Sequence, residues 1–201
     1  MAHNYSRTHW CCRPFYLRPS PAGSVQFYVA TFFTAAVWLG SWIFWGNRRC
    51  FSGRLTRELA RAAAIGLALI AMLILGALIV RHIPFLAGPV SNLLDNMRYG
   101  SVPITLATLV INGVSEELFF RDVARRQLSR VLSPVSSLIA QVALYVAVTA
   151  AMGIPLLLYA SILIGGIAAL EARRTDGLIS ATTLHLVWSI GMAFLLPLVI
   201  G

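Results

Sequence analysis

Residues 112–121 read Asn-Gly-Val-Ser-Glu-Glu-Leu-Phe-Phe-Arg and place two adjacent carboxylates and an arginine inside a long apolar run. On insertion scales, such groups cost roughly 2.5–3.5 kcal/mol each at the centre of a membrane helix. The whole chain has only seven acidic residues. Two neighbouring glutamates in this position therefore indicate a functional site.

A helix over this stretch would give the two glutamates different partners. Glu117 and Arg121 are spaced i, i+4 with the glutamate first, which is the favourable order for an ion pair. Glu116 points about 100° away from Glu117, and Asn112 lies one turn before it, where it could hydrogen-bond the carboxylate. We expect Arg121 to neutralise Glu117 and Glu116 to remain free for chemistry.

The composition indicates a membrane protein. Of the 201 residues, 58% are hydrophobic and 11% are charged, whereas a soluble domain has about 25% charged residues. The apolar residues form blocks, which predicts one all-α domain, a polytopic membrane helix bundle of about six transmembrane helices. The net charge of +9 comes from arginines that lie between these blocks. This pattern favours contact with membrane lipid and no nucleic acid as a partner.

The blocks also define the boundaries. We expect a polar N-terminal tail at 1–22 and a transmembrane helical domain at 23–201, with an Arg-rich loop at 47–61 and a loop or short surface helix at 84–103. The six blocks run over about 24–46, 62–83, from 104 through the glutamate pair, 134–153, 155–171 and from 178 to the end.

The arginines are distributed unevenly between the two predicted ends of the bundle. Ten lie in the first, third and fifth loops, and five lie in the tail and the other two loops. The positive-inside rule then places the odd loops in the cytoplasm and both termini outside. The absence of Lys and the abundance of Ala, Leu and Arg suggest a GC-rich genome, and hence a multi-pass protein of a bacterial plasma membrane.

Two later blocks carry polar side chains at helical spacing. Tyr145 and Thr149 are i, i+4 in one block, and His185 and Ser189 have the same relation in the last. Together with Glu116 they could line a small polar cavity, in which a carboxylate near an imidazole activates water for attack on an amide or holds a metal that does so. The alternative is structural: the histidine bonds a neighbouring helix, and the hydroxyls bond their own helix backbone.

Two motifs resemble those of a known family. Ser-Glu-Glu-Leu-Phe-Phe-Arg at 115–121, followed by Arg-Arg-Gln-Leu and a Ser-Pro turn, resembles the Glu-Glu-x-x-x-Arg motif of the CPBP family. These are the CAAX protease and bacteriocin-processing intramembrane proteins, also called the Abi family. His185-Leu-Val-Trp-Ser189 resembles the family's third motif, His-x-x-x-Asn or Asp. The resemblance covers about residues 100–195.

The second motif departs from the family pattern. The family has Phe-x-x-x-His, and this chain has Tyr145-Val-Ala-Val-Thr149. The resemblance implies that Glu116 is a base or metal ligand, and that His185 is a second ligand or an oxyanion donor. Ser189 would be a weaker oxyanion donor.

We expect Asn112, Tyr145 and Thr149 on the substrate and oxyanion side, where hydroxyls and amides could polarise the carbonyl, and Glu117 and Arg121 to complete the catalytic group. Zinc needs about three protein ligands, and Glu116 with His185 supplies two. The alternative is water activated by Glu116 alone.

These observations leave different classes of function open. The first is an intramembrane endopeptidase acting on a peptide or membrane protein; the resemblance implies substrates such as the C-terminal tails of lipidated proteins. The second is a catalytically impaired family member that binds a membrane peptide or protein, for example in bacteriocin immunity. A third is a small transporter with Glu116 as its proton site.

Overall fold

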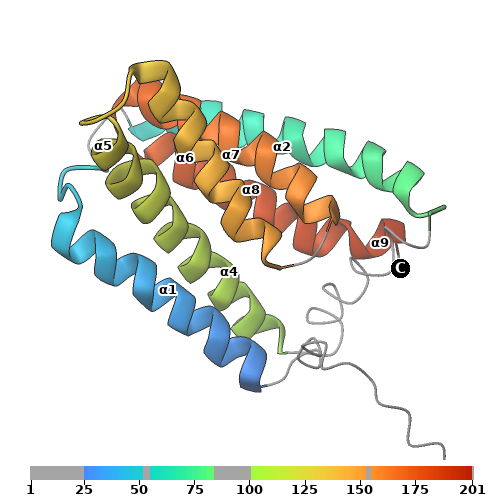
Figure 1. Cartoon of the computed structure of the whole chain (residues 1–201). Coiled ribbons are helices and arrows are strands. Elements are labelled where there is room, and N and C mark those ends of the chain that lie inside the picture. Colours follow the sequence, from blue (N-terminus) through green and yellow to red (C-terminus); the bar gives the residue numbers. More distant parts are fainter. Residues whose placement is uncertain (1–24, 52–54, 84–100, 153–154, 201) are drawn as a thin grey trace, which may run out of the picture.

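The computed structural model describes residues 25–51, 55–83, 101–152 and 155–200. Across these ranges the chain is helical and has no strand (Figure 1). The predicted fold class, an all-α membrane helix bundle, is confirmed. The predicted tail at 1–22 and most of the predicted loop at 84–103 lie outside the described residues.

The helices follow the predicted apolar blocks closely. They are α1 (Val25–Trp45), α2 (Leu55–Val80), α4 (Val102–Glu117), η1 (Leu118–Ala124), α5 (Arg125–Leu128), α6 (Pro134–Ala150), α7 (Pro155–Thr175), α8 (Ile179–Leu195) and α9 (Pro197–Ile200). The segments α4, η1 and α5 follow one another without a break. The predicted Arg-rich loop at 47–61 is wrong at its C-terminal end, because α2 begins at Leu55 and includes Arg57 and Arg61. Residues 55–62 contain good helix formers, and Glu58 in the first turn favours a helix start.

Four described segments are long and apolar enough to cross a membrane. They are Tyr28–Trp45, Leu55–Ile79, Val102–Leu128 and Ile179–Val199, and Pro134–Ala150 is a shorter apolar helix. Large apolar side chains such as Phe33, Phe44, Leu75 and Leu198 are exposed on these helices, as expected where a helix faces lipid rather than water. These features indicate a multi-pass membrane protein.

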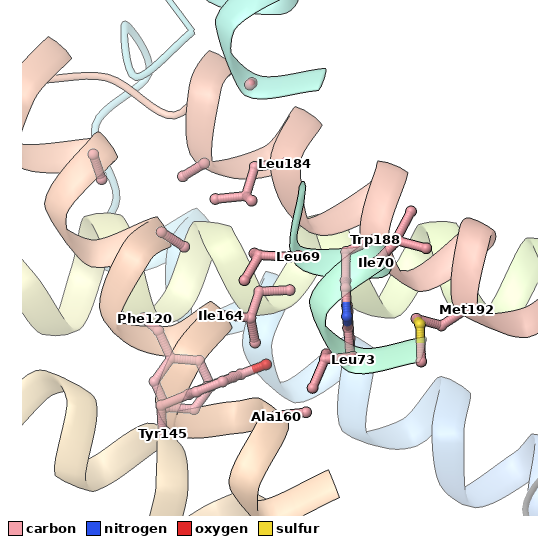
Figure 2. Close-up of a cluster of buried hydrophobic side chains, with 14 of the residues drawn as sticks. Leu69, Ile70, Leu73, Phe120, Tyr145, Ala160, Ile164, Leu184, Trp188 and Met192 are labelled. Atoms are coloured by element: carbon pink, nitrogen blue, oxygen red, sulfur yellow. The ribbon is translucent and has the colours of Figure 1, made fainter. Parts of the chain in front are cut away.

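Close helix contacts form the centre of the bundle. Helix α8 packs against α2, α4 and α7, and α1 lies beside α4 (Figure 1). A Cβ atom added at Gly66 of α2 would lie 2.9 Å from Cγ1 of Val187 on α8, so a small residue lets these two helices approach closely. Figure 2 shows the apolar core, in which Leu69 and Leu73 face Ile164, Leu184 and Trp188.

Loops predicted to share one side of the membrane meet at one end of the bundle. Leu178 N donates to Cys50 O at 2.7 Å, and Arg125 Nη1 lies 2.9 Å from Asp176 Oδ1. These contacts join the first and fifth loops and the segment leading into the third. Which side of the membrane this end faces stays a prediction.

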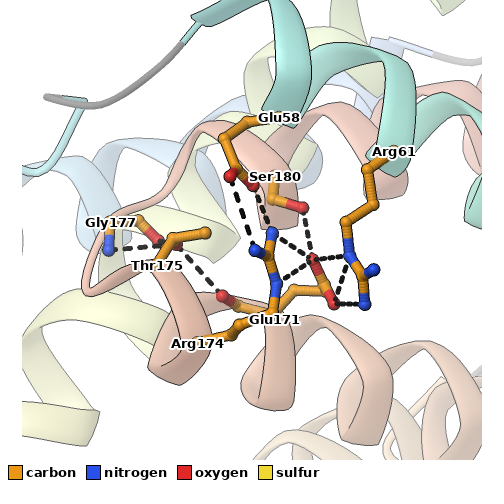
Figure 3. A network of polar contacts seen from close by, with 7 residues as sticks. All are labelled: Glu58, Arg61, Glu171, Arg174, Thr175, Gly177 and Ser180. Atoms are coloured by element: carbon orange, nitrogen blue, oxygen red, sulfur yellow. Dashed lines mark hydrogen bonds and ion pairs between the residues drawn. The ribbon is translucent and has the colours of Figure 1, made fainter.

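A polar network ties three helices together at the same end (Figure 3). Glu171, near the end of α7, accepts hydrogen bonds from Arg61 Nη2 at 3.1 Å, Arg174 Nη2 at 2.9 Å and Ser180 Oγ at 2.7 Å. Arg174 also pairs with Glu58. Burial raises the pKa of Glu171, but the hydrogen bonds from Arg61, Arg174 and Ser180 outweigh it and lower the pKa to about 2. Glu171 lies outside the four candidate spans and acts as a charged junction of α2, α7 and α8.

Candidate active site

The glutamate pair is followed at once by the π-helical segment η1. Such segments are rare and occur frequently at functional sites. All five residues from Phe120 to Ala124 are buried, whereas a regular helix at the edge of a bundle would turn some of them outward. The segment thus buries Arg121 and Asp122 together. No periodicity in the sequence predicted it.

Glu117 and Arg121 form the ion pair that their spacing predicts. Arg121 Nε lies 3.2 Å from Glu117 Oε2, and both side chains are almost completely buried. Arg121 Nη2 also donates to Gly165 O of α7 at 3.4 Å, and its guanidinium carbon lies 4.3 Å from the ring centroid of Tyr145 on α6. The arginine therefore connects three helices around Glu117.

The second oxygen of Glu117 holds His185, a contact the sequence did not reveal. His185 Nδ1 on α8 lies 2.7 Å from Glu117 Oε1. Since a carboxylate only accepts hydrogen bonds, Nδ1 carries the hydrogen, and the neutral imidazole then has a bare Nε2. This Nε2 lies 4.0 Å from Glu116 Oε2. The histidine thus lies between the two glutamates.

Glu116 differs from Glu117 in exposure and in partner. Its side chain is 24% exposed and that of Glu117 is 0% exposed. Tyr145 donates its hydroxyl to Glu116 Oε2 at 3.1 Å. The hydrogen bond that Asn112 could make to Glu116 is not formed among the described residues, and Asn112 Oδ1 is buried without a hydrogen-bond partner there. The partner of Glu116 is therefore Tyr145 from α6, and not Asn112 from its own helix α4.

The ring of Tyr145 is enclosed by its neighbours. Phe120 contacts it edge to face with centroids 5.0 Å apart, and Figure 2 shows the two rings together. A Cβ atom at Gly165 would lie 2.7 Å from Tyr145 Cδ1. The lack of a side chain at Gly165, a position sequence reasoning missed, therefore makes room for the tyrosine.

The remaining predicted site residues make no hydrogen bond to the side chains of this group within the described residues. Thr149 Oγ1 donates to Tyr145 O of its own helix at 3.0 Å, which is the structural alternative considered for it. Ser189 is half-buried, and no hydrogen bond to its side chain is found within the described ranges. The site thus brings together Glu116, Glu117, Arg121, Tyr145 and His185, and leaves Asn112, Thr149 and Ser189 around it.

The residues present do not fit a zinc ion. The described part of the chain has no group of three His, Cys, Asp or Glu side chains placed to hold a metal. The two oxygens of Glu117 contact Arg121 and His185, and Thr149 occupies the position of the family's second-motif histidine. Glu116 and Nε2 of His185 remain, one short of the usual three protein ligands.

Asp122 is a buried carboxylate that sequence reasoning also missed. Its Oδ2 accepts from Trp42 Nε1 at 3.1 Å and from Asn47 N at 2.6 Å. Arg126 Nε lies 3.7 Å from Oδ1. Asp122 therefore fastens the end of α1 to η1. Its position directly after Arg121, as a third acid in the same apolar run, was a signal that could have identified it.

One family of known proteins matches the part of the chain that holds the candidate site. A family model described as type II CAAX prenyl endopeptidase Rce1-like matches residues 98–191, the region that contains both glutamates, Tyr145 and His185. Neither the curated proteins nor the solved structures gave a match. The family resemblance recognised from the motifs is confirmed. Over residues 98–191, the chain is similar to the type II CAAX prenyl endopeptidase Rce1-like family.

Proposed function

We propose that the protein is an intramembrane endopeptidase of the CAAX prenyl protease kind, in which Glu116 activates the attacking water. The family supports this kind of activity. The observation that carries the residue assignment is the 4.0 Å separation of Glu116 Oε2 and His185 Nε2. Both atoms accept hydrogen bonds, and Glu117 holds the imidazole in the required tautomer.

Two acceptors at this separation suit one water molecule. A water about 2.8 Å from each would donate one hydrogen to Glu116 and one to His185. Its lone pairs would then face the carbonyl carbon of a bound peptide bond. As the oxygen–carbon bond forms, Glu116 takes the proton, and it passes that proton to the leaving nitrogen when the carbon–nitrogen bond breaks. The products are a carboxylic acid and an amine.

The other polar residues have supporting roles in this proposal. Glu117 and Arg121 fix His185 and neutralise each other inside the bundle. Asn112 and Ser189 lie one turn from Glu116 and His185 on the same helices, where they would donate to the carbonyl oxygen as negative charge develops on it. The mechanism uses no zinc, because the side chains present supply two ligands and not three.

The family name suggests the substrate: the C-terminal CAAX tail of a prenylated protein, with other peptides or membrane proteins as the broader class. The partial exposure of Glu116 gives such a chain a way to reach the carboxylate. We also infer from the composition that the protein resides in a bacterial plasma membrane, with lipid as its surroundings.

A second candidate function is a catalytically impaired family member that binds a membrane peptide or protein, as in bacteriocin immunity. The observation that favours it is the hydrogen bond from Thr149 to its own helix backbone. A side chain committed in this way supplies nothing to a water near Glu116.

A panel of tagged membrane and lipidated proteins, co-expressed with the wild type, Glu116→Gln or Thr149→His, separates the two functions. Cleavage by the wild type that disappears in Glu116→Gln supports the peptidase. Cleavage gained only in Thr149→His, with capture of an uncleaved tagged protein by the wild type, supports the binding protein. Equal cleavage by the wild type and Glu116→Gln would contradict the role of Glu116.

A further inference from the structure

We infer that Tyr145 is a positioning residue for Glu116 and replaces the second-motif histidine that this chain lacks. The inference rests on the proposed function of Glu116. The Tyr145 hydroxyl lies 3.1 Å from Glu116 Oε2 and is the one hydrogen-bond donor to that carboxylate in the described part of the chain.

Glu116 needs such a contact because its carboxylate has no other hydrogen bond within the described residues. Its side chain is the partly exposed member of the glutamate pair, and a glutamate has three rotatable bonds. In the proposed mechanism its Oε2 must stay beside His185 Nε2 for a water to reach both atoms. A misplacement of about 1 Å can reduce a rate a hundredfold. The Tyr145 hydroxyl occupies one lone pair of Oε2 and leaves the other for water.

Tyr145 is itself held firmly enough to do this. Its ring packs edge to face with Phe120, lies 4.3 Å from the guanidinium carbon of Arg121 and fills the space next to Gly165. These contacts come from η1 and α7, so three helices fix the hydroxyl. A rigid support of this kind is what a positioned catalytic group requires.

The two departures from the family's second motif can then be understood together, as one polar group in place of another. In Phe-x-x-x-His the polar group is at the last position, and here it is at the first, on Tyr145. The hydroxyl of Thr149 has turned to the carbonyl of Tyr145 and leaves Glu116 to the tyrosine. In this proposal the hydroxyl at 145 takes over the role that an imidazole at 149 has in the family pattern.

A double-substitution cycle tests the exchange. The variants are Tyr145→Phe, Thr149→His and their combination, measured in proteoliposomes with a prenylated CAAX peptide. We expect Tyr145→Phe to lower kcat about tenfold to a hundredfold with little change in KM. The combination restores the family pattern and should recover at least tenfold over Tyr145→Phe alone. Tyr159→Phe, an exposed tyrosine of α7, is the matched control and should keep the wild-type kcat.

Two neighbouring glycines provide a test that leaves the hydroxyl in the protein. A methyl group at Gly165 would meet the Tyr145 ring, whereas one at Gly166 would meet no atom within 4 Å. Gly165→Ala should therefore lower kcat, and Gly166→Ala should not. A wild-type kcat in both Tyr145→Phe and Gly165→Ala, in a protein that loses activity with Glu116→Gln, would overturn the inference and leave the proposed function standing.

Infrared spectroscopy of the purified protein tests the contact without any activity. Replacing Tyr145 by Phe should shift the carboxyl band of Glu116, and the shift should be absent when Glu116 is already Gln. If this shift is found while the wild type cleaves nothing, the proposed function fails and the Tyr145–Glu116 contact stands. Identical spectral changes in both backgrounds would overturn the inference.

Discussion

His185 on α8 and Glu117 on α4 are joined through Nδ1 and Oε1 at 2.7 Å, inside a bundle where both side chains are buried. This contact gives the two adjacent glutamates separate tasks. Glu117 holds the imidazole and balances Arg121. Glu116 faces the other ring nitrogen and retains some exposure. The pair therefore combines one structural carboxylate with one that is available for chemistry.

Loss of the charge on Glu117 should destabilise the protein strongly. In Glu117→Gln the buried guanidinium of Arg121 loses the carboxylate that contacts it, and breaking a buried pair in this way costs about 3–5 kcal/mol. Unfolding in detergent micelles measures the change. The double variant Glu117→Gln, Arg121→Gln removes both charges and should recover part of the loss. Wild-type stability in the single variant would contradict the role given to this ion pair.

Asp122 should stabilise the contact between the end of α1 and η1. In Asp122→Asn the amide oxygen can still accept from Trp42 and Asn47, but the negative charge that strengthens both hydrogen bonds is lost, at a cost of about 1–2 kcal/mol. Burial raises the pKa of the nearby Cys50 thiol, and the charge of Asp122 raises it further.

Maleimide labelling of Cys50, with Cys11 and Cys12 replaced by Ser, reports on that change. Labelling should be slow in the otherwise wild-type protein and faster in Asp122→Asn. Asp176→Asn, which alters an exposed carboxylate at the same end of the bundle, should leave the rate unchanged. Equal rates in all three proteins would show that Asp122 does not secure this loop.

The contact between α2 and α8 should be sensitive to size at one glycine and not at another. A Cβ atom at Gly66 would lie 2.9 Å from Val187 and 3.2 Å from the backbone oxygen of Leu184, whereas one at Gly76 meets nothing within 4 Å. We expect Gly66→Leu to lower the free energy of unfolding by about 1–3 kcal/mol or more. Gly76→Leu should be tolerated. Equal effects at the two positions would argue against close packing of these helices.

The pH dependence of stability should reveal the Glu171 network. The pKa of Glu171 is lowered to about 2 from a usual value of 4.5. Its charged form therefore stabilises the fold fully above about pH 4.5, and the contribution is lost as pH falls towards 2. The melting temperature of the wild type should exceed that of Glu171→Gln by a constant amount between pH 5 and 7. A difference that grows on acidification would contradict this assignment.

The sequence predicted what depends on neighbours within one helix. The lengths of the apolar blocks predicted the helices of the bundle, and the i, i+4 spacing predicted the ion pair of Glu117 and Arg121. It did not predict contacts between helices: 68 positions separate His185 from Glu117, and 29 separate Tyr145 from Glu116. Likewise, the sequence offered Asn112 as a partner for Glu116, and the structure shows Tyr145 from another helix in that role. Spacing along one helix does not report which side chains a bundle brings together.

The most direct measurement is the single-turnover cleavage rate of a prenylated CAAX peptide by the wild type and by Glu116→Gln in matched proteoliposomes. General acid–base groups contribute about 10²–10⁴-fold to a rate, so the glutamine variant should be slower by that factor and should melt at a similar temperature. Equal rates in the two proteins would contradict the assignment of Glu116 as the group that activates water.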